Sequence, residues 1–197
     1  MKIGLACVQT KPQDLSFNLD QVINIMTVSQ KHQIDLVLFG EDFLGEQSLS
    51  IDAQALFRLK VASTYYDLAL GVGFIQEGQK NYIIIDKSGE MIYNHLQQKE
   101  FTLNSKSFSL ILGNEGFSAE KVDNILIWPI LNFSTPKEWF NSELSKYRTH
   151  ADSLSNESIL VNSFIDGVAF GGGFHLKDNQ FIVNQPMEQK GLSVLEI

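Results

Sequence analysis

The chain has 197 residues, of which 44% are hydrophobic, and this composition is typical of one ordinary globular domain with a sizeable core. Fifteen basic and 23 acidic residues give a formal net charge of -8 without any basic stripe, which excludes nucleic acid and anionic membranes as expected partners. The single cysteine excludes an intrachain disulfide framework and a cysteine-based zinc cluster, and the four histidines show no ligand spacing, so we expect no metal and no other cofactor.

The chain opens with a predicted strand. Residues 2–9 form an apolar run that ends at Thr10-Lys11-Pro12. The N-terminus therefore shows the pattern of a strand instead of that of a signal peptide. Because no apolar run reaches 18 residues either, we expect a cytoplasmic protein. Cys7 lies inside this strand and is expected to be a small buried residue with an inert thiol. Apolar residues at a three-and-four spacing then predict a helix over 16–31.

The next stretch is the one around which the rest of the sequence is organised. Four apolar residues at 36–39 run into Gly40 and two adjacent carboxylates, Glu41 and Asp42. A short apolar run bounded by a turn signal predicts a strand that is buried on both faces. Glu41 would then lie at the carboxyl end of a central strand, where α/β folds gather their chemistry. The alternative is that both carboxylates are solvated turn residues.

The middle of the chain continues the alternation. Helical spacing over 51–66 is followed by an apolar run at 68–74, and a turn glycine between 81–86 and 91–95 predicts a hairpin. This order is typical of a layered α/β domain with a mixed sheet. Lys99 lies just past the hairpin, either as a functional cation at a strand end or as an ordinary surface lysine.

A second carboxylate follows a strand later in the chain. The predicted strand 108–112 stops at Gly113-Asn114-Glu115-Gly116, which places Glu115 at its end. Thr135-Pro136-Lys137-Glu138 combines a cap, a proline at the first helical position and a glutamate three residues after the cap, so it predicts a helix over 135–155. The remaining predicted strands are 125–129, 158–163, 180–183 and 192–197. No linker divides the sequence, so we expect one domain over 1–197.

In this order, the pieces resemble the carbon–nitrogen hydrolase, or nitrilase-like, superfamily from Lys2 to Ile197. Residues 36–41 resemble the family strand that ends in Pro-Glu, with Gly40 in place of the proline, and Glu41 matches the catalytic glutamate. Gln98-Lys99 resembles the Arg-Lys of the family, so Lys99 is the candidate for the family lysine, with His95 as the alternative. The other matching pieces are 2–9, Asn18-Leu19, the hairpin at 81–89, and 139–162 with Arg148.

The resemblance implies a fold and an assembly. The fold is an α-β-β-α four-layer sandwich, in which two mixed sheets pack face to face and the helices at 16–31, 51–66 and 135–155 lie outside. Family members usually associate, so we expect at least a homodimer, and Trp139 and Phe140 are candidates for part of its surface.

The sequence departs from the family at the nucleophile. Family members carry Cys-aromatic-acidic after a strand, whereas this chain reads Leu112-Gly113-Asn114-Glu115 there. Glu115 keeps the acidic residue, but Gly113 stands in the place of the cysteine. Cys7 is no substitute, because it lies inside the first strand and not at a strand end beside Glu41 and Lys99.

Splitting an amide or a nitrile by the family route needs a thiolate, a carboxylate base and a cation for the developing oxyanion. Since glycine supplies no nucleophile, we expect thiol-dependent hydrolysis to be impaired or lost, with binding of a small amide or nitrile-like ligand as the retained property. Two alternatives remain open at this point. One is a water-mediated hydrolase that uses Glu41, Lys99 and Glu115, and the other is a structural or interaction protein with a closed pocket.

Overall fold

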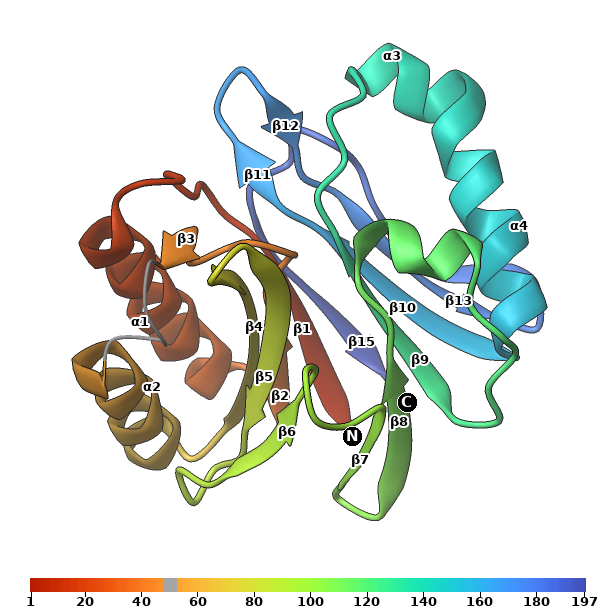
Figure 1. Cartoon of the computed structure of the whole chain (residues 1–197). Coiled ribbons are helices and arrows are strands. Elements are labelled where there is room, and N and C mark those ends of the chain that lie inside the picture. The colour runs from red at the N-terminus through yellow and green to blue at the C-terminus, as the bar shows by residue number, and fades with distance from the viewer. Residues whose placement is uncertain (48–52) are drawn as a thin grey trace.

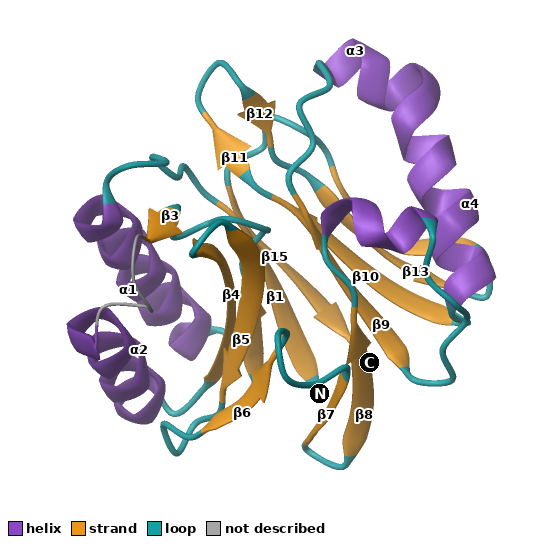
Figure 2. Cartoon of the chain, in the orientation of Figure 1, coloured by secondary structure: helices purple, strands orange, loops and turns teal. Residues whose placement is uncertain are grey.

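The computed structural model describes residues 1–47 and 53–197, which form four layers (Figure 1). Two mixed sheets pack face to face, and helices cover the outer face of each sheet (Figure 2). The helices are α1 (Leu15–Lys31), α2 (Ala53–Tyr66), the 3₁₀ turn η1 (Gly113–Phe117), α3 (Pro136–Glu138), the π-helical segment η2 (Trp139–Glu143) and α4 (Leu144–Leu154). The predicted four-layer sandwich is therefore confirmed.

The first sheet runs in the order β15 (Gly191–Glu196), β1 (Lys2–Cys7), β2 (Leu36–Leu38), β4 (Ala69–Gln76), β5 (Gln79–Ile85) and β6 (Met91–Asn94), with β3 (Glu46–Gln47) paired to β4. The second runs in the order β14 (Gln180–Gln185), β13 (Gly173–Lys177), β10 (Glu157–Asn162), β9 (Ile125–Ile130), β8 (Lys106–Leu110) and β7 (Glu100–Leu103). A short ribbon joins β11 (Phe164–Ile165) and β12 (Ala169–Phe170). The innermost neighbours in each sheet, β1, β2 and β4 in one and β8, β9 and β10 in the other, are parallel.

Three apolar clusters hold the layers together. Strand β2 shows why, because its alternate side chains serve two of them: Leu36 and Leu38 pack between the sheets, whereas Val37 and the following Phe39 pack against α1 and α2. This is the strand buried on both faces that the sequence predicted. The third cluster lies between the second sheet and α4, with Trp128 at its centre.

The helix starts follow the sequence signals closely. The Thr135 hydroxyl accepts a hydrogen bond from the Glu138 N–H at 3.3 Å, and the Glu138 carboxylate accepts one from the Thr135 N–H at 2.9 Å. This reciprocal cap begins α3 as predicted. The helix expected over 51–66 is seen from Ala53, and its first two positions lie outside the described residues.

Some elements differ from the expectation. Strands β3, β7, β11, β12 and β13 are absent from the sequence prediction, since they are short or follow glycine-rich segments that carry little periodicity. Trp139 is only 5% exposed and packs on Tyr147 with ring centroids 5.4 Å apart, so it is not available for the dimer surface suggested above. Phe140 is 79% exposed. Within the described part of the chain, no helix has the length and apolar character needed to cross a membrane.

Candidate functional site

Glu41 lies where the ends of several central strands meet. It follows β2, is 1% exposed, and its Oε2 accepts a hydrogen bond from the N–H of Leu131, just past β9, at 2.9 Å. Its carbonyl oxygen accepts from the hydroxyl of Ser163, just past β10. A Cβ on the preceding Gly40 would come within 2.5 Å of the Ser163 nitrogen, so this position has no room for a side chain. Glu41, which follows a strand of the first sheet, is thus held at its carboxylate and at its carbonyl by residues that follow strands of the second sheet.

The cation at Glu41 is Lys80. Its ammonium forms an ion pair with Oε1 of Glu41, and its side chain is 47% exposed, so it reaches from solvent to the buried carboxylate. Lys80 lies on β5, where Tyr82 and Ile84 point between the sheets, and the two-residue period of a strand puts Lys80 on that same face. Sequence reasoning missed Lys80 because it began this strand at Asn81. The alternation of positions 80, 82 and 84 was the signal that could have found it.

Burial and charge act in opposite directions on this pair. Burial raises the pKa of Glu41 above its ordinary value, although the hydrogen bonds from Lys80 and Leu131 act to lower it. Burial also raises the pKa of the neighbouring Asp42 carboxyl. For Lys80, burial lowers the pKa, but the hydrogen bond and the charge of Glu41 outweigh this effect, so that the pKa is raised overall. Lys80 is therefore firmly charged.

Gly113 lies directly against this carboxylate. It follows β8 as the first residue of η1, has a positive φ of 46°, and accepts a hydrogen bond at its carbonyl from Nε1 of Trp128 at 2.8 Å. A Cβ built on Gly113 would lie 2.5 Å from both carboxylate oxygens of Glu41. The structure therefore brings together Glu41 and the position at which the resemblance implies a nucleophile, and it leaves no room there for a side chain unless Glu41 moves.

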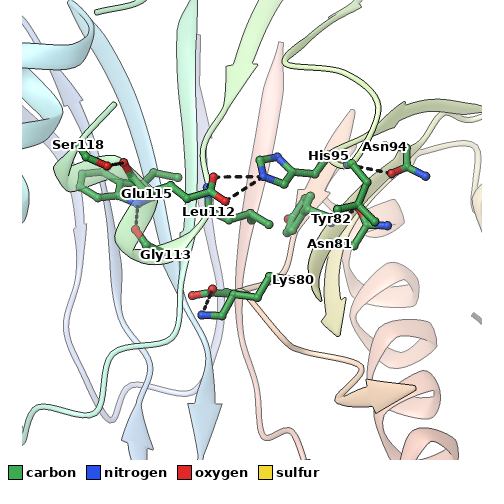
Figure 3. A network of polar contacts seen from close by, with 12 residues as sticks. Lys80, Asn81, Tyr82, Asn94, His95, Leu112, Gly113, Glu115 and Ser118 are labelled. Carbon is green, nitrogen blue, oxygen red and sulfur yellow. Dashed lines mark hydrogen bonds and ion pairs between the residues drawn. The ribbon is translucent and has the colours of Figure 1, made fainter. Parts of the chain in front are cut away.

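Glu115 takes part in a neighbouring network (Figure 3). Its Oε2 lies 3.1 Å from Nε2 of His95 and 3.3 Å from the N–H of Leu112, which donates to it. Nδ1 of His95 lies 3.0 Å from the hydroxyl of Tyr93, so both ring nitrogens of the imidazole have partners. His95 is thus paired with Glu115, and Lys80 lies close enough for the Glu115 charge to raise its pKa.

Lys99 does not take the position beside Glu41 that the sequence suggested. It lines a cavity of about 460 Å³ together with His95 and Glu115, and Glu41 is not among the residues that line this cavity. The four sequence candidates therefore fall into two places, Glu41 with Gly113 in one and Lys99 with Glu115 in the other.

Cys7 is fully buried, and its sulfur accepts a hydrogen bond from the N–H of Gly172 at 3.4 Å. A Cβ on Gly171 would lie 2.1 Å from this sulfur, so the thiol is enclosed by that segment. Burial raises the pKa of the thiol, which disfavours the reactive thiolate. Among the described residues, no three or more His, Cys, Asp and Glu side chains gather in a way that could hold a metal ion.

The arrangement pairs a buried carboxylate with an ammonium but offers no attacking side chain. A buried carboxylate accepts N–H donors and an adjacent ammonium donates to a carbonyl oxygen, so the pair is complementary to a carboxamide group. The residue in the expected place of attack, Gly113, carries no nucleophile.

Neither a family model nor any curated protein sequence matches the chain. Solved structures of an amidase from Nesterenkonia sp. do match its fold. One is 16% identical with a TM-score of 0.76, covering 100% of this chain and 90% of that chain. A glutamate-to-glutamine mutant of the amidase from Nesterenkonia sp. AN1, with acrylamide added to its active-site cysteine, is 15% identical with a TM-score of 0.75, covering 100% and 93%. A cysteine-to-alanine mutant with butyramide is 15% identical with a TM-score of 0.76, covering 100% and 90%. This amidase is described as a nitrilase-superfamily protein, so the chain has a nitrilase-superfamily fold.

Proposed function

We propose that the chain is a carbon–nitrogen hydrolase superfamily protein, formed by one domain over 1–197, that has lost the thiol nucleophile and binds a small carboxamide without hydrolysing it. The observation that carries this proposal is the contact between Gly113 and Glu41, in which the carboxylate lies 2.5 Å from the place of an absent Cβ. The superfamily assignment rests on the fold together with the ordered strand ends from Glu41 to Glu115.

The loss of one side chain is enough to stop the reaction. In covalent amide hydrolysis, the thiolate attacks the carbonyl carbon, the carboxylate takes the thiol proton, and a cation holds the oxyanion. Removing the nucleophile from such a unit costs about as much as removing the whole unit, because its members act together. Glu41 and Lys80 would then remain as a base and a cation without a group to activate.

The same pair explains the proposed ligand. Glu41 would accept the N–H groups of a carboxamide, and the Lys80 ammonium would donate to its carbonyl oxygen. A ligand must first displace the ammonium of Lys80 from the carboxylate, and the half-exposed lysine side chain has solvent into which it can turn. The similar structures of the Nesterenkonia amidase in complex with acrylamide and with butyramide suggest a ligand of about the size of these two amides.

Titration of the ¹⁵N-labelled protein with butyramide tests this proposal. We expect the amide signal of Leu131, which donates to Glu41, to shift with butyramide concentration, and we expect Glu41→Gln to weaken the binding at least severalfold. The matched control is Glu196→Gln, since the Glu196 side chain is 75% exposed and pairs with Lys2 instead. No shift at Leu131 at millimolar butyramide would refute the ligand-binding half of the proposal.

A second candidate function follows from the burial of Glu41. At 1% exposure, with Lys80 and Leu131 bonded to its carboxylate, the site also fits a closed pocket in a structural or interaction protein. The butyramide titration separates the two, because a closed pocket gives no shift. The hypothesis of a water-mediated hydrolase that uses Glu41, Lys99 and Glu115 together has less support. Lys99 and Glu115 line a cavity, and Glu41 is not among its lining residues.

We propose in addition that the protein is a cytoplasmic homodimer. The strand pattern of residues 2–9 and the lack of an apolar run of 18 residues are the sequence features that favour the cytoplasm. Phe140 and Phe133, which are 79% and 61% exposed, are the aromatic residues near α3 that would contribute to a dimer surface.

A further inference from the structure

A cavity lies apart from the Glu41–Lys80 pair and is not used by the proposed function. Its volume of about 460 Å³ is within the range of small-ligand pockets. It is open to solvent on one side and is lined by residues from the segment leading into β7, from β8, from η1 and from 118–122.

The inner wall of the cavity is apolar. Ile111, which follows β8 and is 9% exposed, lines it together with Ala119 and Val122, and all three belong to the apolar cluster between the second sheet and α4, whereas the Leu110 side chain packs between the sheets. Such a surface favours an aliphatic group, because contact with it removes apolar area from water.

The rest of the lining carries charges of both signs. Lys99 and Lys121 contribute ammonium groups, and neither forms an ion pair with another residue in the described part of the chain. Glu100 and Glu120 contribute carboxylates, of which that of Glu100 accepts only a long 3.4 Å hydrogen bond from Ser109. Two cations and two carboxylates, all exposed, therefore line one cavity together with His95 and Glu115, which pair with each other.

We infer that this cavity binds a small zwitterionic amino acid with an aliphatic side chain. The ligand carboxylate would contact Lys99 and Lys121, its ammonium would contact Glu100 and Glu120, and its side chain would lie on the wall formed by Ile111, Ala119 and Val122. A ligand with a charge of one sign only would satisfy half of these groups and meet like charge from the other half. The opposed charges of the cavity therefore select for a zwitterion.

Three probes that differ only in charge test the inference. They are L-leucine, 4-methylpentanoate, which lacks the ammonium, and 3-methylbutylamine, which lacks the carboxylate. In titrations of the ¹⁵N-labelled protein, we expect leucine to shift the signals of Ser109 and Val122 and to bind about tenfold more tightly than either analogue. Equal affinities, or no leucine binding at millimolar concentration, would overturn the inference.

A pair of lysine variants locates the effect. Lys99→Gln should weaken leucine binding about tenfold, whereas the control Lys137→Gln, an exposed lysine of α3 that does not line the cavity, should leave it unchanged. Shifts confined to residues elsewhere, or equal effects of the two variants, would also refute the site. Because these signals and probes differ from those of the butyramide experiment, failure here leaves the proposed function standing, and the reverse holds as well.

Discussion

Gly113 and Glu41 compete for the same space. The carboxylate oxygens lie 2.5 Å from where a Cβ at position 113 would stand, and the backbone there has a positive φ of 46° that L side chains rarely adopt. Glycine therefore suits this turn for two reasons: it adopts the positive φ without strain, and it has no side chain to clash with the Glu41 carboxylate. Any side chain at this position would require a different placement of Glu41.

Gly113→Ala should accordingly destabilise the protein by about 3 kcal/mol, because it adds a clash with a buried carboxylate to the strain of the left-handed backbone. The control is Gly167→Ala, where φ is 70° but nothing lies within 4 Å of the added Cβ. There we expect a loss of about 1 kcal/mol from backbone strain alone. Urea denaturation of the two variants measures the difference, and equal losses would contradict the packing described for Gly113.

The ion pair at Glu41 should make stability depend on pH in a definite direction. Because burial holds the folded-state pKa of Glu41 above its ordinary 4.5, the folded protein binds this proton more tightly than the unfolded chain does. The contribution of Glu41 to stability therefore falls as the pH rises from 4.5 through the folded-state pKa. Lys80 limits this loss, since its own raised pKa keeps it charged throughout that range.

Lys80→Met should thus cost little at about pH 4, where Glu41 is neutral, and about 1–3 kcal/mol at about pH 8, where the carboxylate is left without its cation. Urea denaturation at both pH values gives the comparison. Lys87→Met is the control, because the Lys87–Asp67 pair is exposed on both sides and its loss should be small at either pH. A loss for Lys80→Met that does not grow with pH would show that Lys80 does not neutralise Glu41.

At the scale of elements, the sequence predicted correctly those strands and helix starts that depend on neighbouring residues alone. The run at 36–39 became β2 with both faces buried, and Thr135 capped α3 with Glu138. Lys80 was missed because the predicted strand began one residue too late, at Asn81, although the alternation of positions 80, 82 and 84 along β5 was a local signal for its face. Lys99 was misplaced because a position just past a strand end does not say which cavity the side chain enters.

The cap of α3 can be tested on its own. Thr135→Ala should destabilise the protein by about 1 kcal/mol, because the Glu138 N–H loses its acceptor at the helix start. Thr149→Ala is the matched control, as its hydroxyl bonds to the Ser145 carbonyl within α4 and alanine is the better helix former there. If thermal denaturation showed the same loss for both variants, the cap would not be what stabilises this helix.

At the scale of the whole molecule, the sequence displays the apolar patterns of the individual strands and helices, and three apolar clusters pack these elements into four layers. The resemblance, and not periodicity, supplied the face-to-face packing of the sheets. Assembly is harder to foresee, because an aromatic residue in a helix serves the core or the surface according to the rotation of that helix. Trp139 and Phe140 are adjacent, and only Phe140 is exposed.

We predict a homodimer in light scattering at about ten micromolar protein, and Phe140→Ser should shift it toward the monomer by removing an exposed aromatic anchor. Phe57→Ser provides the comparison, since Phe57 is similarly exposed at 65% but lies on α2, on the opposite outer layer. A monomeric parent protein would rule out the assembly, and a dimer sensitive to Phe57 alone would move the interface to α2.

The absence of a usable nucleophile is tested most directly by ammonia release from butyramide, measured for the unmodified protein and for Cys7→Ser. With Gly113 against Glu41 and the Cys7 sulfur enclosed by Gly171 and Gly172, both proteins should release no ammonia above the buffer rate. Ammonia release by the unmodified protein that disappears in Cys7→Ser would contradict the account, because it would make the buried thiol of β1 the nucleophile.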